Sequence, residues 1–352
     1  MTKVKKSRCL IVTLCKSPNY GAFLQAFALK QILSERGHDV SCLDIYDADN
    51  NVKRYRMLYR GWRRHPRGIL FNTLKLLTFR LAERDLNIVD SSEISDFQAA
   101  FIGADEIWSV TNGTFNTAPE FFGLNMNGVL KFSYAPSVGN SGIDDIAKYP
   151  SYVEGLCNLD KISVRDGESL QVASTVTGRD DVTMVLDPTF LHDFSTNEEK
   201  ITIPGRYILV YTYGFSAPLV EEVKAYARKY RLRIISAGFY HPWADKNYSC
   251  SPFQFLSLIK SSECVITDTF HGSIFAIKYR KNFLSYGRHK KKVKHLLESL
   301  GLHGSLVDPG FLSDGHSFNT DYSMIDERLS PLMTVSVDYL ERCDALIRAK
   351  QQ

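Results

Sequence analysis

The sequence predicts an α/β protein made of two Rossmann-like, doubly wound domains that face each other across a cleft. Two observations lead to this prediction. The chain has 352 residues, about twice the length of an ordinary domain. Short apolar runs also alternate with helix-like segments along the chain, a pattern typical of parallel sheets with right-handed crossovers. We expect residues 1–195 to form the first domain and residues 205–352 the second, with the polar stretch 192–205 connecting them.

The expected strands are short apolar runs. In the first domain they are Cys9–Leu14, Val40–Ile45, Ala99–Ile102, Phe132–Ala135, Ile162–Val164 and Met184–Leu186. In the second domain they are Tyr207–Tyr211, Leu232–Ser236, Cys264–Thr267 and Phe283–Ser285. Helical patterns between these last runs cover Leu219–Lys229, Pro252–Ile259 and Ser273–Tyr279. A final helix, about Val335–Ala349, is expected to pack back on the first domain.

Composition narrows the class of protein. Hydrophobic residues make up 44% and charged residues 23% of the chain, which is typical of a globular protein and not of a disordered one. The seven cysteines are scattered and contain no CxxC pair, so neither a disulfide framework nor a metal site is expected. The apolar run near the N-terminus is short and closed by Lys16, unlike a secretion signal. We therefore expect a cytoplasmic protein without a membrane-spanning helix.

Residues 51–84 form a basic and amphipathic insertion in the first domain. Between residues 51 and 82 there are nine Lys or Arg and no acid, although the whole chain carries a net charge of only +4. Leu70, Leu74, Leu77 and Leu81 recur at helical spacing. One interpretation is an interfacial anchor that holds the protein peripherally on the anionic inner face of the cell membrane. The other is a solvated charge run beside a core-facing helix. No nucleic-acid-binding motif accompanies the segment, so we expect no nucleic-acid partner.

In a doubly wound fold, ligands bind beyond the carboxyl ends of the strands, so residues that follow predicted strands are candidates for the site. Asp105 follows a strand in the string GADEIW, and Arg165 ends another, where a guanidinium can bind a carboxylate or phosphate. In the string VITDTFHGSIFAI a strand leads through a turn into a helix that begins near Gly272, with Asp268, Thr269 and His271 close to its start. A helix N-terminus attracts anions, and a histidine there can exchange a proton near neutral pH.

Taken in order, these strings resemble the polysaccharide pyruvyl transferase family. The strings are NYGAFLQAFAL, FIGADEIW, FSYAPSVG, ISVRD, VLDPTFL, SPFQFLSLI and TDTFHGSIFAI, and they span roughly Asn19–Phe283. The resemblance implies an architecture similar to B-type glycosyltransferases. It also implies transfer of the enolpyruvyl-derived group of phosphoenolpyruvate to sugar hydroxyls, as a cyclic ketal in a capsule, exopolysaccharide or wall polymer. Members of the family are not generally metal-dependent, and no cofactor is expected beyond the donor substrate.

The resemblance and the chemistry together suggest roles for single residues. Phosphoenolpyruvate carries two anionic groups, and forming a ketal requires an acid and a base. We expect His271 to transfer protons and to neutralise the phosphate, and Asp105 to act as a base or to orient the sugar. The donor-binding candidates are Arg165, Thr269, Gly272 and Ser273. The acceptor or cleft candidates are Asn19, Tyr20, Gln25, Asp268 and Trp243.

One position departs from the family pattern. Many relatives place an arginine where this chain has Thr269, so the sequence lacks one phosphate-binding cation. Lys278 and Arg280, or the cluster 288–294, are candidates to replace it.

Alternatives remain open at this stage. Asp187, before a proline, has the pattern of a strand terminator or helix cap. The acceptor is expected to be a saccharide, and a precursor linked to a lipid diphosphate, a nucleotide sugar and a finished polymer are the alternatives. A nucleotide-sugar-dependent glycosyltransferase is the alternative function, because a cleft with a basic helix N-terminus also suits a diphosphate. A third hypothesis is that the protein binds saccharides and has no enzymatic activity.

Overall fold

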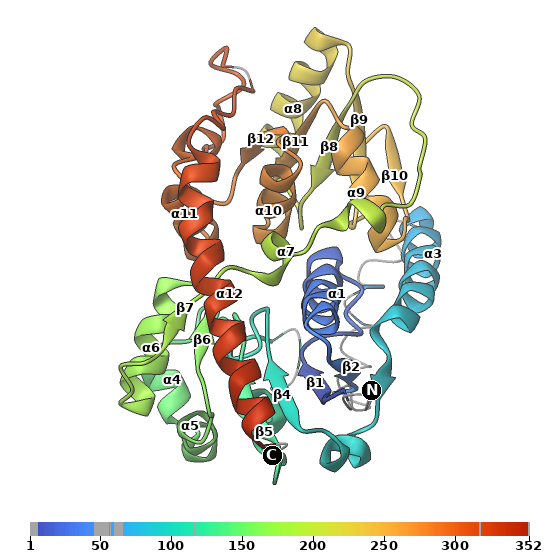
Figure 1. The fold of residues 1–352 in the computed structure, drawn as a ribbon. Coiled ribbons are helices and arrows are strands. Elements are labelled where there is room, and N and C mark those ends of the chain that lie inside the picture. Colours follow the sequence, from blue (N-terminus) through green and yellow to red (C-terminus); the bar gives the residue numbers. More distant parts are fainter. Residues whose placement is uncertain are drawn as a thin grey trace.

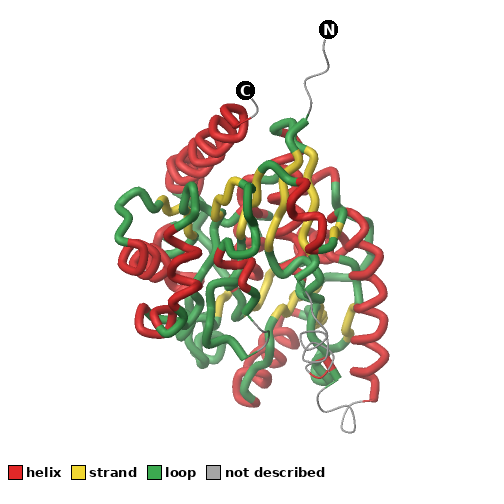
Figure 2. The backbone as a smooth tube through the Cα atoms, turned by 90° about the horizontal axis from the view of Figure 1, so that it is seen from below, coloured by secondary structure: helices red, strands yellow, loops and turns green. Residues whose placement is uncertain are grey.

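The computed structural model describes residues 6–45, 56, 58–59, 66–113, 115, 117–316 and 318–350. This part of the chain forms two five-stranded sheets, each with the same strand order and each entirely parallel. Figure 1 shows the two sheets in separate halves of the molecule, and Figure 2 shows helices on either side of the strands. The predicted fold class, two doubly wound α/β units, is confirmed.

The first sheet has the order β3-β2-β1-β4-β5. Its strands are β1 (Arg8–Val12), β2 (Asp39–Leu43), β3 (Ile88–Val89), β4 (Ala99–Ile102) and β5 (Leu130–Ser133). Four of the five match predicted runs. The fifth, β3, lies at the edge of the sheet and has only two residues, which is too short to give a recognisable apolar run. A small pair, β6 (Ser163–Val164) and β7 (Thr183–Met184), follows β5 and is joined to it by a bridge between Phe132 and Lys161.

The second sheet has the order β10-β9-β8-β11-β12. Its strands are β8 (Tyr207–Tyr211), β9 (Arg233–Ala237), β10 (Lys246–Tyr248), β11 (Cys264–Thr267) and β12 (Asn282–Ser285). Again the edge strand, β10, is the one without a predicted counterpart. Its sequence, Lys-Asn-Tyr, is polar because one side of an edge strand meets solvent.

The helices connect and cover the strands. Those of the first half are α1 (Tyr20–Glu35), α3 (Pro66–Ala82), α4 (Ile143–Ala147), α5 (Pro150–Cys157), α6 (Gly167–Thr177) and α7 (Pro188–Leu191). Those of the second half are α8 (Ala217–Tyr230), α9 (Pro252–Ser261), α10 (Phe270–Lys278), α11 (Lys291–Ser299) and α12 (Ile325–Lys350). Short 3₁₀ turns are η1 (Glu83–Leu86), η2 (Ser91–Asp96), η3 (Pro119–Phe122), η4 (Phe194–Thr196) and η5 (His303–Ser305). Among these described helices, none combines the length and apolar character needed to cross a bilayer.

Helix α1 joins the two halves through an apolar interface. It packs against α9 and α10 of the second half as well as against α7, β1 and β2 of its own half. Its rings Phe23 and Phe27 meet Phe253 of α9 at centroid distances of 5.8 and 4.9 Å. Because it is covered on both sides, α1 is apolar nearly all the way round.

Helix α12 runs along both halves of the molecule (Figure 1) and contacts the first sheet. The hydroxyl of Tyr339 donates to the carbonyl of Ser133 in β5 at 2.7 Å. The carboxylate of Asp344 accepts from Arg36 at 2.7 Å and lies 2.9 Å from the Nε2 atom of His38. The helix begins ten residues before the predicted Val335, because the sequence around Pro331 does not interrupt it.

Helix α3 belongs to the first half in sequence but packs on the second. The hydroxyl of Ser249 donates to the Phe71 carbonyl at 2.8 Å, and Thr78 donates to the Cys250 carbonyl at 3.1 Å. Its buried face contains Phe71, Lys75 and Phe79, whereas the four leucines that suggested the helix point outward. Most of the basic insertion before α3, including Arg60, Arg63 and Arg64, lies outside the described residues.

Candidate active site

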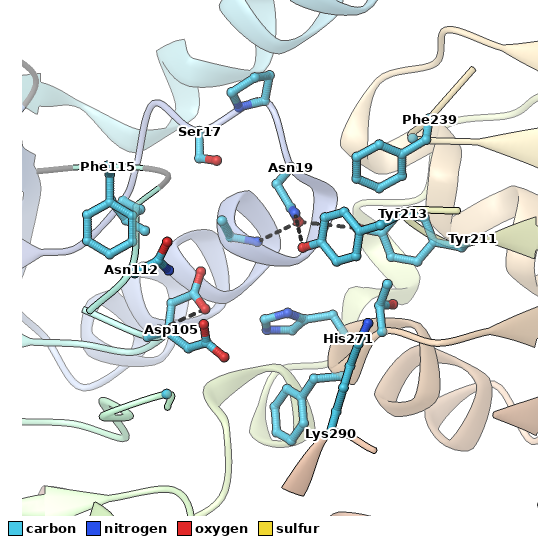
Figure 3. Close-up of a pocket in the computed structure, with 18 of the residues that line it drawn as sticks. Ser17, Asn19, Asp105, Asn112, Phe115, Tyr211, Tyr213, Phe239, His271 and Lys290 are labelled. Carbon is cyan, nitrogen blue, oxygen red and sulfur yellow. Dashed lines mark hydrogen bonds between the residues drawn. The ribbon is translucent and has the colours of Figure 1, made fainter. Parts of the chain in front are cut away.

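A cavity of about 780 Å³ lies between the two sheets. Its walls come from the segments that follow β1, β2, β4 and β5 in the first sheet, β6 beside that sheet, and β8, β9, β11 and β12 in the second. All of these segments begin at carboxyl ends of parallel strands, which is where this architecture places ligands. The volume is in the usual range for a small-molecule site. Figure 3 shows the side chains of both halves converging on it.

Four of the eleven predicted site residues line this cavity, and seven lie behind its walls or away from it. Asn19, Asp105, Thr269 and His271 line it. The other seven are Tyr20, Gln25, Arg165, Asp268, Gly272, Ser273 and Trp243. The four lining residues present polar atoms to the cavity. Several of the seven others hold these four residues in place.

Asn19 ties the two halves together at the start of α1. Its Oδ1 atom accepts hydrogen bonds from the Gly21 amide at 2.9 Å and from the Tyr211 hydroxyl at 3.2 Å. Its Nδ2 atom donates to the Tyr213 hydroxyl at 3.3 Å (Figure 3). Asn19 is therefore a helix cap that also joins α1 to the end of β8.

Asp105 is held by the loop after β4. The preceding residue, Ala104, donates its N–H to Gln25 Oε1 at 2.9 Å and accepts at its carbonyl from Thr13 at 3.1 Å. Asp105 has a φ of 74°, a backbone conformation that residues other than glycine adopt mainly at turns and functional sites. Gln25 is fully buried and so positions Asp105 without lining the cavity itself.

His271 lies in the first turn of α10, with its imidazole against the backbone of Gly21. A Cβ atom at position 21 would come within 2.2 Å of the Nδ1 atom of His271, so only glycine leaves room for the ring. The histidine is 8% exposed. Its Nε2 atom is fully buried, 3.4 Å from Asp187 Oδ2, and makes no hydrogen bond within the described part of the chain. The second ring nitrogen, Nδ1, is the one beside Gly21.

Asp187 links this histidine to Arg165. Its carboxylate caps α7, accepting from the Thr189 amide at 3.1 Å, and lies 3.2 Å from Arg165 Nη1. Burial by itself raises the pKa of Asp187, but His271 and Arg165 outweigh it and hold that pKa well below the usual range. The sequence pattern predicted the cap. The contacts with His271 and Arg165 depend on tertiary structure.

Arg165 connects Asp187 to Asp105. Its Nη2 atom lies 3.5 Å from Asp105 Oδ1, and the ring of Phe270 covers the guanidinium at 4.5 Å. The side chain is only 1% exposed. Burial acts to lower its pKa, but the two aspartates outweigh this and raise the pKa above its ordinary value. Arg165 therefore faces the two carboxylates and not the cavity, in contrast to the expected direct contact with a donor.

The polar groups at the start of α10 are largely hydrogen-bonded to one another. The Thr269 hydroxyl caps the helix by accepting from the Gly272 amide at 3.0 Å, and the Ser273 hydroxyl donates to the Thr269 carbonyl at 3.1 Å. Only Thr269 of these three lines the cavity. The observed helix begins at Phe270, three residues before the predicted start, because this cap precedes it.

We call His289 and Lys290–Lys292 the basic rim. These residues follow β12 in sequence and line one side of the cavity. Lys290 pairs with Asp268 at 2.8 Å, and Lys292 pairs with Glu106 on the opposite half. Of the two groups of cations considered as substitutes for the family arginine, this cluster is the one at the cavity. Lys278 donates to the Phe190 carbonyl at 3.3 Å, and Arg280 pairs with Asp326, both away from it.

Two aromatic candidates belong to the core. The hydroxyl of Tyr20 donates to the Cys250 carbonyl at 2.9 Å, and its ring stacks on Phe255 at 4.3 Å. The ring of Trp243 packs beside His241 at 5.5 Å in the core of the second half. In the described part of the chain, the exposed aromatic side chain that lines the cavity is Tyr213, which follows β8 and could have been predicted from the strand-end rule.

Comparison with known proteins identifies the family. A family profile described as polysaccharide pyruvyl transferase matches residues 19–290. The chain belongs to this family. The predicted resemblance is thus confirmed, and membership in a family of pyruvyl transferases implies a transferase that acts in polysaccharide biosynthesis. A search of curated proteins finds no significant match.

Solved structures similar to this pyruvyl transferase family member share its fold at low sequence identity. The UDP-GlcNAc 2-epimerase from Methanocaldococcus jannaschii has a TM-score of 0.51 at 12% identity, covering 94% of this chain and 99% of that one. The UDP-N-acetylglucosamine 2-epimerase from Rickettsia bellii has a TM-score of 0.50 at 10% identity, covering 98% and 97%. The calicheamicin glycosyltransferase CalG4 has a TM-score of 0.48 at 12% identity, covering 98% of each chain. At this identity the similarity concerns the fold alone.

Proposed function

We propose that the protein transfers the enolpyruvyl-derived group of phosphoenolpyruvate to two hydroxyls of a saccharide and so forms a pyruvate ketal. Family membership supports the reaction class. The observation that carries the proposal within the site is a buried network of Asp105, Arg165, Asp187 and His271 whose two ends open on a cavity with a basic rim. Such a site combines an acid and a base with cations for an anionic donor.

The basic rim is the proposed contact of the donor. Phosphoenolpyruvate carries a phosphate and a carboxylate, and Lys290, Lys291 and Lys292 bring three ammonium groups to one side of the cavity. Two of them are paired with Asp268 and Glu106, and they can turn toward an entering anion because their side chains are about one quarter exposed. Thr269, which also lines the cavity, adds a hydroxyl. We assign Arg165 a positioning role behind Asp105 and His271.

The proposed chemistry uses His271 and Asp105 in turn. His271, holding a proton on Nδ1, gives it to the methylene carbon of the donor, and positive charge develops at the adjacent carbon. The first sugar hydroxyl adds there and passes its proton to Asp105. Phosphate then leaves with its oxygen and takes that proton, and the second hydroxyl adds while its proton returns to His271. The sum is phosphoenolpyruvate plus a diol giving a ketal plus inorganic phosphate, with both side chains regenerated.

Asp187 and Arg165 support these steps electrostatically. The buried carboxylate of Asp187, 3.4 Å from Nε2, orients the imidazole and stabilises positive charge on it. Arg165 lies between Asp187 and Asp105, and its charge helps to keep the pKa of Asp187 low. Fixed charges of this kind favour a transition state in which charge develops on the substrate, because they need no reorganisation.

For the acceptor we propose a saccharide that is assembled for a capsule or exopolysaccharide and is still linked to a lipid diphosphate. The deciding experiment incubates the protein with phosphoenolpyruvate and a panel of such saccharides, and it measures inorganic phosphate together with the mass of the product. We expect phosphate release that depends on the acceptor, and a mass gain of one pyruvate less one water. Release of a nucleoside diphosphate from a nucleotide sugar would instead support the glycosyltransferase alternative.

A further inference from the structure

Helix α3 has an apolar stripe on its outer side. We define the leucine stripe as Leu70, Leu74, Leu77 and Leu81, which are 63%, 45%, 50% and 59% exposed. Their spacing of four, three and four residues places them in one narrow row along the helix. Four large apolar side chains in a row on a single exposed helix face mark an interaction surface more strongly than scattered ones do.

The orientation of this stripe is fixed by the opposite face of α3. That face is anchored to the second half of the molecule: Lys75 donates to the Gly238 carbonyl at 2.6 Å, and Phe71 and Thr78 are bonded to the segment 249–250. Phe79 stacks on the buried ring of Tyr20 at 5.2 Å. The helix therefore cannot turn its leucines inward without breaking these contacts.

The exposed charged side chains that the structure describes within α3 are both positive. They are Arg67 and Arg80, near the two ends of the helix. In sequence the stretch 51–82 contains nine Lys or Arg, of which Lys75 is buried, and no acid. The nearest acids in sequence, Glu83 and Asp85, follow in the turn η1. Helix α12 offers a contrast, because its exposed apolar residues Val335 and Leu346 share their helix with several acids.

These charges indicate which partner fits. A symmetric contact with a second copy would bring the same patch against itself and set cations against cations. A membrane leaflet with anionic lipids offers negative charge at its surface and apolar chains below it, matching both parts of the patch. We propose that the leucine stripe and its flanking arginines dock α3 on an anionic membrane surface.

Docking in this way places the cavity beside the membrane. Ile69, Asn72 and Lys75 of α3 line the cavity, so the same helix carries the stripe on one side and forms a cavity wall on the other. A helix with its side chains is about 10 Å across, so the wall lies about that far from the surface. Where the proposed pyruvyl transfer holds, this arrangement suits an acceptor whose lipid stays in the leaflet while its saccharide enters the cavity.

The test of docking is independent of catalysis. The full chain is mixed with vesicles of phosphatidylcholine, with or without phosphatidylglycerol, and the fraction that floats with them is measured. We expect binding only to the anionic vesicles, weakened by added salt. The double substitution Leu74→Glu, Leu77→Glu is expected to lower binding at least about tenfold, because it removes two insertions and repels the anionic surface.

The control is Val335→Glu, Leu346→Glu on α12, which makes the same change in net charge on exposed apolar positions of another helix. We expect this variant to bind vesicles as the wild type does. Failure of the wild type to float with anionic vesicles, or equal loss in both double variants, would overturn the docking proposal. A shift from dimer to monomer in the Leu74, Leu77 variant, without vesicle binding by the wild type, would show that a second copy covers the stripe.

Activity measurements separate docking from the proposed function. The Leu74, Leu77 variant is expected to keep its rate on a water-soluble saccharide and to lose rate on a lipid-linked one presented in anionic vesicles. Equal rates on the vesicle-borne acceptor would contradict the role of docking. If no ketal forms with any acceptor, the proposed function fails, while the flotation result still decides whether α3 binds membranes.

Discussion

Substitution of Gly21 by alanine adds one carbon atom beside the ring of His271 and so tests where that ring lies. The added Cβ would lie 2.2 Å from Nδ1 and 2.3 Å from Cγ of the imidazole. Ordinary contacts of this kind are about 3.4 Å or longer, so the ring must move by roughly 1 Å. Asp187, on the other side of the ring, limits where it can go. A misplacement of about 1 Å in a reacting group costs on the order of 100-fold in rate.

The fold should tolerate this change. Gly21 lies in α1, where alanine is favoured over glycine by up to about 1 kcal/mol, which opposes the strain of moving the ring. We therefore expect Gly21→Ala to lose about 100-fold in the rate of phosphate release from phosphoenolpyruvate while its melting temperature stays near that of the wild type. Gly304→Ala is the matched control, because an added Cβ there meets nothing within 4 Å. Wild-type turnover in a folded Gly21→Ala protein would refute the assignment of Nδ1 as the proton-transferring atom.

Three further predictions follow from the charged groups. Asp187→Asn should lower turnover by at least about tenfold. The folded-state pKa of Asp187 is depressed, so its contribution to stability is present above pH ~4 and is lost as pH falls. Unfolding measured at decreasing pH should therefore show a shrinking difference in stability between wild type and variant. Lys292→Met should raise the KM for phosphoenolpyruvate about tenfold with little change in kcat. Lys294→Met, on the same helix but outside the cavity, should leave both constants unchanged. A larger rise in KM for Lys294→Met than for Lys292→Met would argue against the basic rim. Burial lowers the pKa of Lys75 to about 7, so the unfolded chain binds more protons than the folded one between pH 7 and 10, and the wild type should gain stability across that window. Denaturant unfolding of Lys75→Met should lack this rise in unfolding free energy with pH. An equal rise in both proteins would show that Lys75 is not buried as described.

The sequence predicted the central strands well because parallel strands buried on both faces are continuous apolar runs. It missed β3 and β10, which are short, lie at sheet edges and carry no such run. It also placed the start of α10 late, because Thr269 was considered as a ligand and not as a cap. Local patterns thus located the strand ends, and with them the cavity, better than they located helix boundaries.

Individual side chains were harder to predict than the cavity. Tyr20 and Gln25 lie at the right strand end, but both side chains are buried and bonded within the protein, Tyr20 to Cys250 of the second half and Gln25 to the loop after β4. Arg165 also follows a strand, yet Phe270 covers it and two aspartates hold it. These outcomes depend on residues that lie from 22 to 230 positions apart in sequence, which a local pattern cannot contain. The domain limits at 195 and 205 stay a prediction.

The most direct test of the central claim is a crystal structure of the protein with phosphoenolpyruvate. We expect the donor in the cavity between the two sheets, with its anionic groups at Lys290–Lys292 and its methylene carbon within reach of His271 Nδ1. An empty cavity at saturating donor, or a donor bound elsewhere on the molecule, would contradict it.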